Sequence, residues 1–217
     1  METTTKLEEV LKSFTGANGN ESRLNSQFKN LANYFLLNGY FLINNQVKVY
    51  LRSIEFYYHE ENGVIKDPIT YHKNTTKHIV PYYPIGLMNM HQSGIDITFE
   101  SEKEQYRASM LIRGFNIVNR TEDLTPLYES RSTYIYEAFF MQFPIQNKIQ
   151  LEWVEEPLNY PGAKISSQKR LNVSLYNDTG KKIKAEEMPE YEPTQNKKYV
   201  QDPRKWRFTL ELETKPL

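Results

Sequence analysis

Apolar positions near the N-terminus repeat every three or four residues. Within residues 1–24 this spacing predicts a short helix followed by a loose stretch rich in Gly and Asn. Over residues 25–37 the same spacing predicts an amphipathic helix, which Asn38-Gly39 ends. The apolar residues that carry the two patterns are Leu7, Val10, Leu11 and Phe14, then Leu24, Phe28, Leu31, Phe35 and Leu36. We therefore expect residues 1–24 to precede a single domain that spans 25–217.

Strict alternation of side chains then replaces the helical spacing. Residues 46–58 read as a strand. One face would carry Val47, Val49, Leu51, Ser53, Glu55 and Tyr57, and the other Lys48, Tyr50, Arg52, Ile54 and Phe56. Further strands are predicted at 94–100, 106–118, 171–177 and 205–213, and a mixed, helical stretch at 123–142. In the strand predicted at 94–100, Ile95, Ile97 and Phe99 should share a buried face.

This order of elements predicts an α/β fold of the α+β type. We expect one domain with a curved, mostly antiparallel sheet and a few flanking helices. The 16 Tyr and 11 Phe of the chain agree, because aromatic residues favour strands. The charged connection over 177–205 is interpreted as surface.

Composition narrows the classes of partner. The chain has 27 Lys+Arg and 27 Asp+Glu, so its formal net charge is zero, which counts against nucleic-acid binding by bulk electrostatics. The absence of Cys excludes disulfide-linked partners, zinc–thiolate sites and thiol nucleophiles. The N-terminus does not resemble a secretion signal, and no apolar run reaches membrane-spanning length. These features predict a cytoplasmic monomer without a membrane partner.

Glu55 is the residue whose position is hardest to explain as surface. In the alternating pattern it follows Val47, Val49 and Leu51 on an apolar face. A carboxylate in such a place is paired, protonated or functional, because burying an isolated charge is costly. A buried carboxyl group near neutral pH is suited to general base catalysis. The alternative is a structural ion pair with Arg52, Arg113 or Lys48.

Three histidines offer a different chemistry. His72, His78 and His91 follow the strand, with Asp67 nearby. These residue types can bind a metal, so a metal-dependent hydrolase is one hypothesis for the function. Their spacings match no helical pair of ligands, and loop histidines are usually only polar loop residues. We expect no metal and no other cofactor.

The segment from Leu31 to Arg120 resembles the alkyladenine (3-methyladenine) DNA glycosylase family. LANYFLLNGYFLI is similar to that family's opening helix and first strand, and KVYLRSIEFYY to its strand ending in Glu-x-Tyr. DPITYHKN is similar to the Asp…His loop that follows, and GIDITF with MLIRGF to the core hairpin. KRLNVSL and KWRFTL loosely resemble the closing strands. The order and spacing of these motifs imply a glycosylase-like fold.

The resemblance also implies roles for single residues. Glu55 matches the catalytic acid that orients a water against C1′ of the deoxyribose. Tyr57 matches the aromatic residue that stacks on the flipped base, and His72 the histidine that contacts it. Arg113 is structural or phosphate-facing. His91 is a further base-binding candidate at a position where the family carries aromatic residues.

The resemblance leads to two hypotheses for the function. The first is a DNA repair-type N-glycosylase that excises an alkylated purine, with DNA as its partner. The alternative is a non-catalytic module that binds a nucleobase, a nucleoside or a single strand on the same fold. Ser93 favours the alternative, because a serine cannot fill the stack that a flipped base leaves.

Overall fold

Two long strands form the centre of the protein. The computed structural model describes residues 6–70, 72–75, 77–119, 127–129, 132–136, 150–177 and 179–212. Strand β2 (Val47–Glu60) pairs antiparallel with β5 (Tyr106–Asn119) along its whole length. The opposite edge of β2 pairs first with β1 (Gly39–Ile43) and then with β9 (Arg207–Glu211). One strand therefore joins segments from both ends of the chain.

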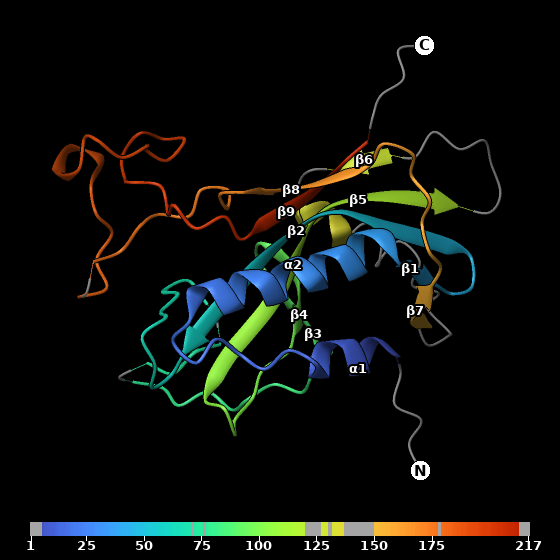
Figure 1. Cartoon of the computed structure of the whole chain (residues 1–217), viewed down its shortest axis with the longest axis horizontal. Helices are drawn as coiled ribbons and strands as arrows, with labels where there is room; N and C mark the ends of the chain where they lie inside the picture. The colour runs from blue at the N-terminus through green and yellow to red at the C-terminus, as the bar shows by residue number, and fades with distance from the viewer. Residues whose placement is uncertain are drawn as a thin grey trace.

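The remaining strands extend this centre into a curled antiparallel sheet (Figure 1). Nine strands are found among the described residues, and every pairing between them is antiparallel. The outer strands are β3 (Met88–His91), β4 (Gly94–Thr98), β6 (Leu127–Glu129), β7 (Leu151–Glu155) and β8 (Lys164–Gln168). The predicted α+β fold with a curved antiparallel sheet is confirmed.

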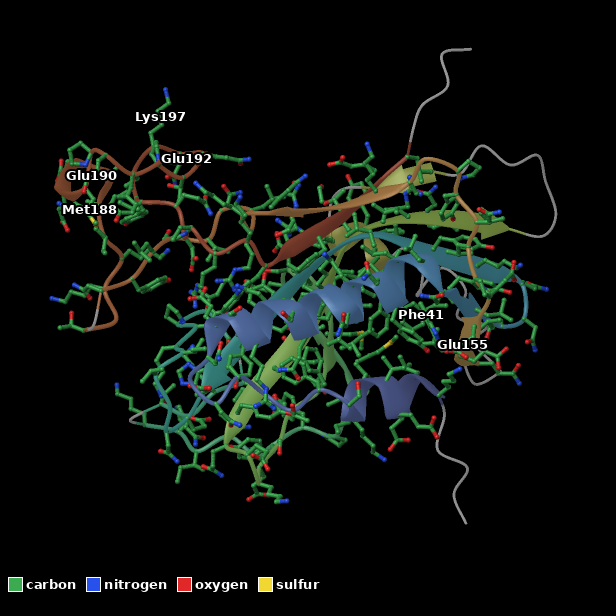
Figure 2. All side chains as sticks on the ribbon, in the orientation of Figure 1. Phe41, Glu155, Met188, Glu190, Glu192 and Lys197 are labelled. Atoms are coloured by element: carbon green, nitrogen blue, oxygen red, sulfur yellow. The ribbon has the colours of Figure 1, made fainter. Side chains whose placement is uncertain are left out.

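In the described part of the chain, helices α1 and α2 cover one face of the sheet. Helix α1 spans Lys6–Lys12, and α2 spans Glu21–Leu37. The side chain of Asn20 caps α2 by accepting a hydrogen bond from the N–H of Arg23 (3.0 Å). Phe28 of α2 stacks on Phe56 of β2 with ring centroids 4.4 Å apart. The side chains drawn in Figure 2 fill the space between this helix and the sheet.

The predicted core positions are confirmed. Val47, Val49 and Leu51 are buried, and so are Ile95, Ile97 and Phe99. Leu11, Phe14 and Ala17 from the N-terminal segment belong to the same cluster.

Several predicted elements differ from the structure. Within 123–142, Leu127–Glu129 forms strand β6, so the helical prediction is wrong there. Ser132–Tyr134 forms a 3-10 helix and residues 135–136 are α-helical, so the prediction holds over these five residues. Positions 123–126, 130–131 and 137–142 of that prediction lie outside the described residues. Residues 171–177 form no regular strand, because only Ser174 and Tyr176 make isolated bridges. Strands β3, β7 and β8 were not predicted.

The charged connection extends away from the sheet. It contains the 3-10 turn Ala185–Glu187 and isolated β-bridges such as Lys184 with Tyr199. Met188, Glu190 and Lys197 lie on this outer segment in Figure 2. No helix among the described residues is both long enough and apolar enough to cross a membrane.

Candidate active site

Halfway along each of the two central strands, the alternation of core-facing and outward-facing residues shifts by one position. In β2 the core contains Val47, Val49 and Leu51, but beyond Ser53 it contains Ile54, Phe56 and Tyr58. The pairing with β5 is irregular between Leu51 and Ile54. Such an irregularity changes which face a side chain takes. The prediction that Glu55 shares a face with Val49 and Leu51 is therefore wrong, since Glu55 points away from the helices.

The face that carries Glu55 is polar and nevertheless buried. Across the sheet, Glu55 lies opposite Leu111 of β5, and Leu111 lies opposite Asp96 of β4. Tyr57 lies opposite Ser109, whose hydroxyl is 3.2 Å from Asp96 Oδ2. Two segments contribute contacts on this face: the loop after β2, and residues 169–176 before the charged connection. Burial of so many polar groups requires specific partners.

The carboxylate of Glu55 has three such partners. Its Oε2 accepts a hydrogen bond from the hydroxyl of Tyr57 (2.9 Å), and its Oε1 accepts one from the backbone N–H of Leu171 (2.9 Å). The Nε of Arg113 lies 3.4 Å from Oε1. Glu55 is 1% exposed. All three groups are donors and thus suit a carboxylate, which accepts but does not donate.

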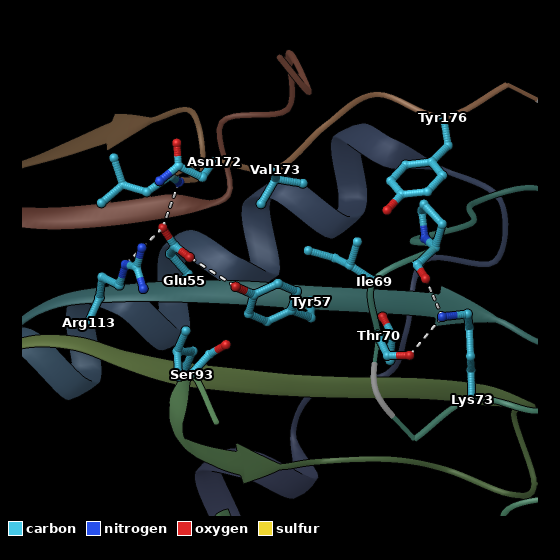
Figure 3. A pocket seen from close by; sticks show the side chains of 13 residues that line it. Glu55, Tyr57, Ile69, Thr70, Lys73, Ser93, Arg113, Asn172, Val173 and Tyr176 are labelled. Carbon is cyan, nitrogen blue, oxygen red and sulfur yellow. Dashed lines mark hydrogen bonds and ion pairs between the residues drawn. The ribbon is translucent and has the colours of Figure 1, made fainter. Parts of the chain in front are cut away.

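Glu55 and Tyr57 line an open cavity of about 600 Å³ (Figure 3). This volume falls within the range of roughly 300–1,000 Å³ that is usual for small-molecule sites. The loop after β2, with Ile69 and Thr70, forms another part of the wall, and Asn172 lies beside Glu55. The complete lining is Glu55, Tyr57, Pro68, Ile69, Thr70, Lys73, Ser93, Leu111, Arg113, Leu171, Asn172, Val173 and Tyr176.

The two cations of this lining are held by the chain. Besides its contact with Glu55, Arg113 donates from Nη1 to the hydroxyl of Ser132 (2.9 Å). The Nζ of Lys73 donates to the carbonyl oxygens of Pro68 and Thr70. Burial lowers the pKa of Lys73. The prediction that Arg113 is structural or phosphate-facing remains a prediction, although its neighbours are now known.

Arg170 supports the cavity from behind. Its guanidinium group lies over the ring of Tyr57, 5.0 Å from the centroid, and at the same distance over Trp206. It donates to Asp67 and, over 3.1 Å, to Asp202. Its side chain is fully buried. Arg170 thus links its own segment, residues 169–176, to the loop after β2 through Asp67 and to the residues before β9 through Asp202.

Tyr57 is fixed by these neighbours. Burial, the charge of Glu55 and other smaller effects raise its pKa well above the usual value of 10, so it stays a donor. One side of its ring faces Arg170, and the residue lines the cavity. The ring is therefore held rigidly.

His72 occupies a separate buried cluster. Its Nε2 lies 2.9 Å from Oε1 of Glu100, and it is absent from the lining of the cavity. Burial lowers the pKa of His72 to about 4 and raises that of Glu100 to about 7. The other oxygen of Glu100 pairs with Arg107 (3.1 Å). The expected convergence of Glu55, Tyr57 and His72 on one cavity therefore holds for the first two only.

The three histidines do not share a site. His91 lies on the edge strand β3 with its Nε2 3.2 Å from Asp96, and it does not line the cavity. His78 is exposed on the loop. In the described part of the chain, no three His, Cys, Asp or Glu side chains are grouped as metal ligands. Ser93, in the turn after His91, does line the cavity.

The residues that sequence reasoning missed come mainly from the C-terminal third. Arg170, Leu171 and Asn172 complete the site, yet their segment was noted only for a loose likeness to a closing strand. Lys73 directly follows His72 and lines the cavity in its place. Neither hydrophobic period nor residue spacing marks these positions.

The protein was compared with known protein families, curated proteins and solved structures. No protein-family model, no curated protein and no solved structure matches the chain. The function must therefore be argued from the cavity itself.

Proposed function

We propose that the protein hydrolyses the N-glycosidic bond of a purine, as a DNA repair-type N-glycosylase that excises an alkylated base. The observation that carries the proposal is the position of Glu55, a buried carboxylate at an open cavity, held by two hydrogen bonds and an ion pair with Arg113. A general base must be fixed within reach of its substrate, and Glu55 is fixed at a space large enough for a base and its sugar.

In this reaction Glu55 orients a water molecule and accepts its proton. The water oxygen forms a bond to C1′, and the bond from C1′ to the base nitrogen breaks. Its electron pair leaves with the base. Alkylation makes the base a better leaving group because it adds positive charge to the ring. Arg113 and Tyr57 would keep the carboxylate aligned throughout.

Aromatic residues in the lining could bind the base by stacking. Tyr57 presents a rigid ring to the cavity, and Tyr176 also lines it. Stacking on an aromatic residue contributes roughly 1–3 kcal/mol per base and accepts any base. Thr70 adds a buried hydroxyl that has no hydrogen-bond partner in the described part of the chain.

The test is release of free base from an oligonucleotide that carries a single alkylated purine, at low salt. Glu55→Gln is the matched variant, because its amide can still accept from Leu171 and donate to the Tyr57 oxygen. We expect base release to fall by about a hundredfold or more, the scale for loss of a positioned general base. Equal release by the wild type and Glu55→Gln would contradict the proposal.

Ser93 supports the second function, a base-binding module without catalysis. It lines the cavity where an aromatic wedge would be needed to replace a flipped base in a duplex. No release by the wild type, together with nucleoside binding that Tyr57→Ala abolishes, would select this function. If only the wedge is missing, Ser93→Tyr should improve release from duplexes more than from single strands.

A further inference from the structure

We propose that a second cavity beside the first binds the phosphate group of the nucleotide whose base occupies the Glu55 cavity. The inference rests on the proposed function for the base. The second cavity has a volume of about 540 Å³ and shares Leu171 and Asn172 with the first. These two residues are the wall between them. Asn172 has a positive φ of 57°, and its side chain is exposed at this wall.

The charges of this second cavity suit an anion. Its lining includes Lys169, Arg207 and Lys197, against the single carboxylate of Glu192. Lys169 pairs with Glu192 at the surface, where such pairs contribute little. Arg170 also reaches this wall, but Asp67 and Asp202 already neutralise it.

Arg207 is the group best placed to bind the phosphate. It lies directly opposite Glu55 where β9 pairs with β2, and Gln168 of β8 lies opposite Arg207 on its other side. Opposite residues project to the same face. One Nη of Arg207 donates to the side-chain oxygen of Gln168. Its Nε is buried and has no partner in the described part of the chain. A guanidinium group in the lining of a cavity is a strong donor to phosphate.

The spacing of the two sites matches one nucleotide. Side chains directly opposite on neighbouring strands have Cβ atoms about 4.5–5.5 Å apart. A glycosidic bond at Glu55 would thus lie one strand away from a phosphate at Arg207, and the sugar would span the wall at Asn172. Arg207 could bind the phosphate of a free nucleotide or a phosphodiester group of a single strand by the same hydrogen bonds.

The test measures binding in the Glu55→Gln protein, which should hold its ligand without turnover. The ligands are 7-methylguanosine, its 5′-monophosphate and a single-stranded trinucleotide with 7-methylguanine in the centre. Arg207→Gln removes the proposed phosphate ligand. Lys164→Gln, on β8 but lining neither cavity, removes one positive charge as a control.

We expect the phosphorylated ligands to bind about tenfold or more tightly than the nucleoside, which is the scale of one charged hydrogen bond. Arg207→Gln should abolish this advantage and leave nucleoside binding within about twofold, whereas Lys164→Gln should change neither. An advantage for the trinucleotide alone would assign the site to a strand, and one for both ligands to a nucleotide phosphate. Equal binding of all three ligands, or an advantage that survives Arg207→Gln, would overturn the inference.

Inorganic phosphate separates this inference from the proposed function. Titration of phosphate should shift the Nε–Hε signal of Arg207 in the NMR spectrum of the wild type. A shift without any nucleoside binding would support the phosphate site and contradict the base site. Nucleoside binding without a shift would overturn the phosphate site and leave the base site standing.

Discussion

His72 and Glu100 share a buried cluster, and burial is the largest of the effects that shift the pKa of each. The pKa of His72 falls to about 4 and that of Glu100 rises to about 7, because burial penalises the charged form of each. As the pH falls from 6.5 towards 4, the unfolded chain protonates His72 and the folded chain does not. His72 therefore makes folding less favourable in acid. Glu100 acts in the opposite direction, since its ionisation is penalised in the folded state as the pH rises from 4.5 through 7.

His72→Gln and Glu100→Gln should consequently show mirrored pH dependence. Each variant loses contacts and is less stable than the wild type. For His72→Gln this deficit should shrink as the pH falls below 6.5, and for Glu100→Gln as the pH rises from 4.5 to 7. One proton corresponds to about 1.4 kcal/mol per pH unit. Urea unfolding at pH 4.5 to 7.5 measures both deficits, and two deficits that do not vary with pH would contradict the assignment.

At the scale of elements, Arg170 holds together the two segments that close the cavity. It is fully buried between Asp67 and Asp202. Arg170→Met leaves both carboxylates without their buried partner, so we expect a loss of about 3–5 kcal/mol in the free energy of unfolding. Arg204 also pairs with Asp202, but its side chain is 17% exposed, so Arg204→Met should cost less than Arg170→Met. Equal losses in the two variants, measured by urea unfolding, would show that Arg170 is not the main link.

The sequence predicts the helices and central strands well because their apolar periods continue over many residues. It assigns Glu55 to the wrong face, because the irregularity near Ser53 leaves no mark in an alternating pattern. It also misses the partners of that face. Asp67 and Arg170 are 103 residues apart, and Glu55 and Leu171 are 116 apart. Contacts at such separations depend on the folded chain and not on local spacing.

At the scale of the whole molecule, a formal net charge of zero limits how strongly the proposed function could bind nucleic acid through its phosphates. Affinity should come from the base cavity and from one or two phosphates. For a single strand, the slope of log K against log salt should then be no steeper than about −1.4, the value for two phosphates. This slope is measured by fluorescence anisotropy of a labelled single strand at salt concentrations from about 50 to about 200 mM. A slope of about −4 or steeper would require a basic surface that the proposed sites do not provide.

The central claim is that water held by Glu55 attacks the sugar carbon. The most direct test is to run base release in water enriched in ¹⁸O and to analyse both products by mass spectrometry. Wild-type protein should leave one ¹⁸O at C1′ of the sugar and none in the base, at a rate that Glu55→Gln lowers to near the protein-free control. Label in the base, a sugar without label, or labelling that is equal in the two proteins would contradict the account.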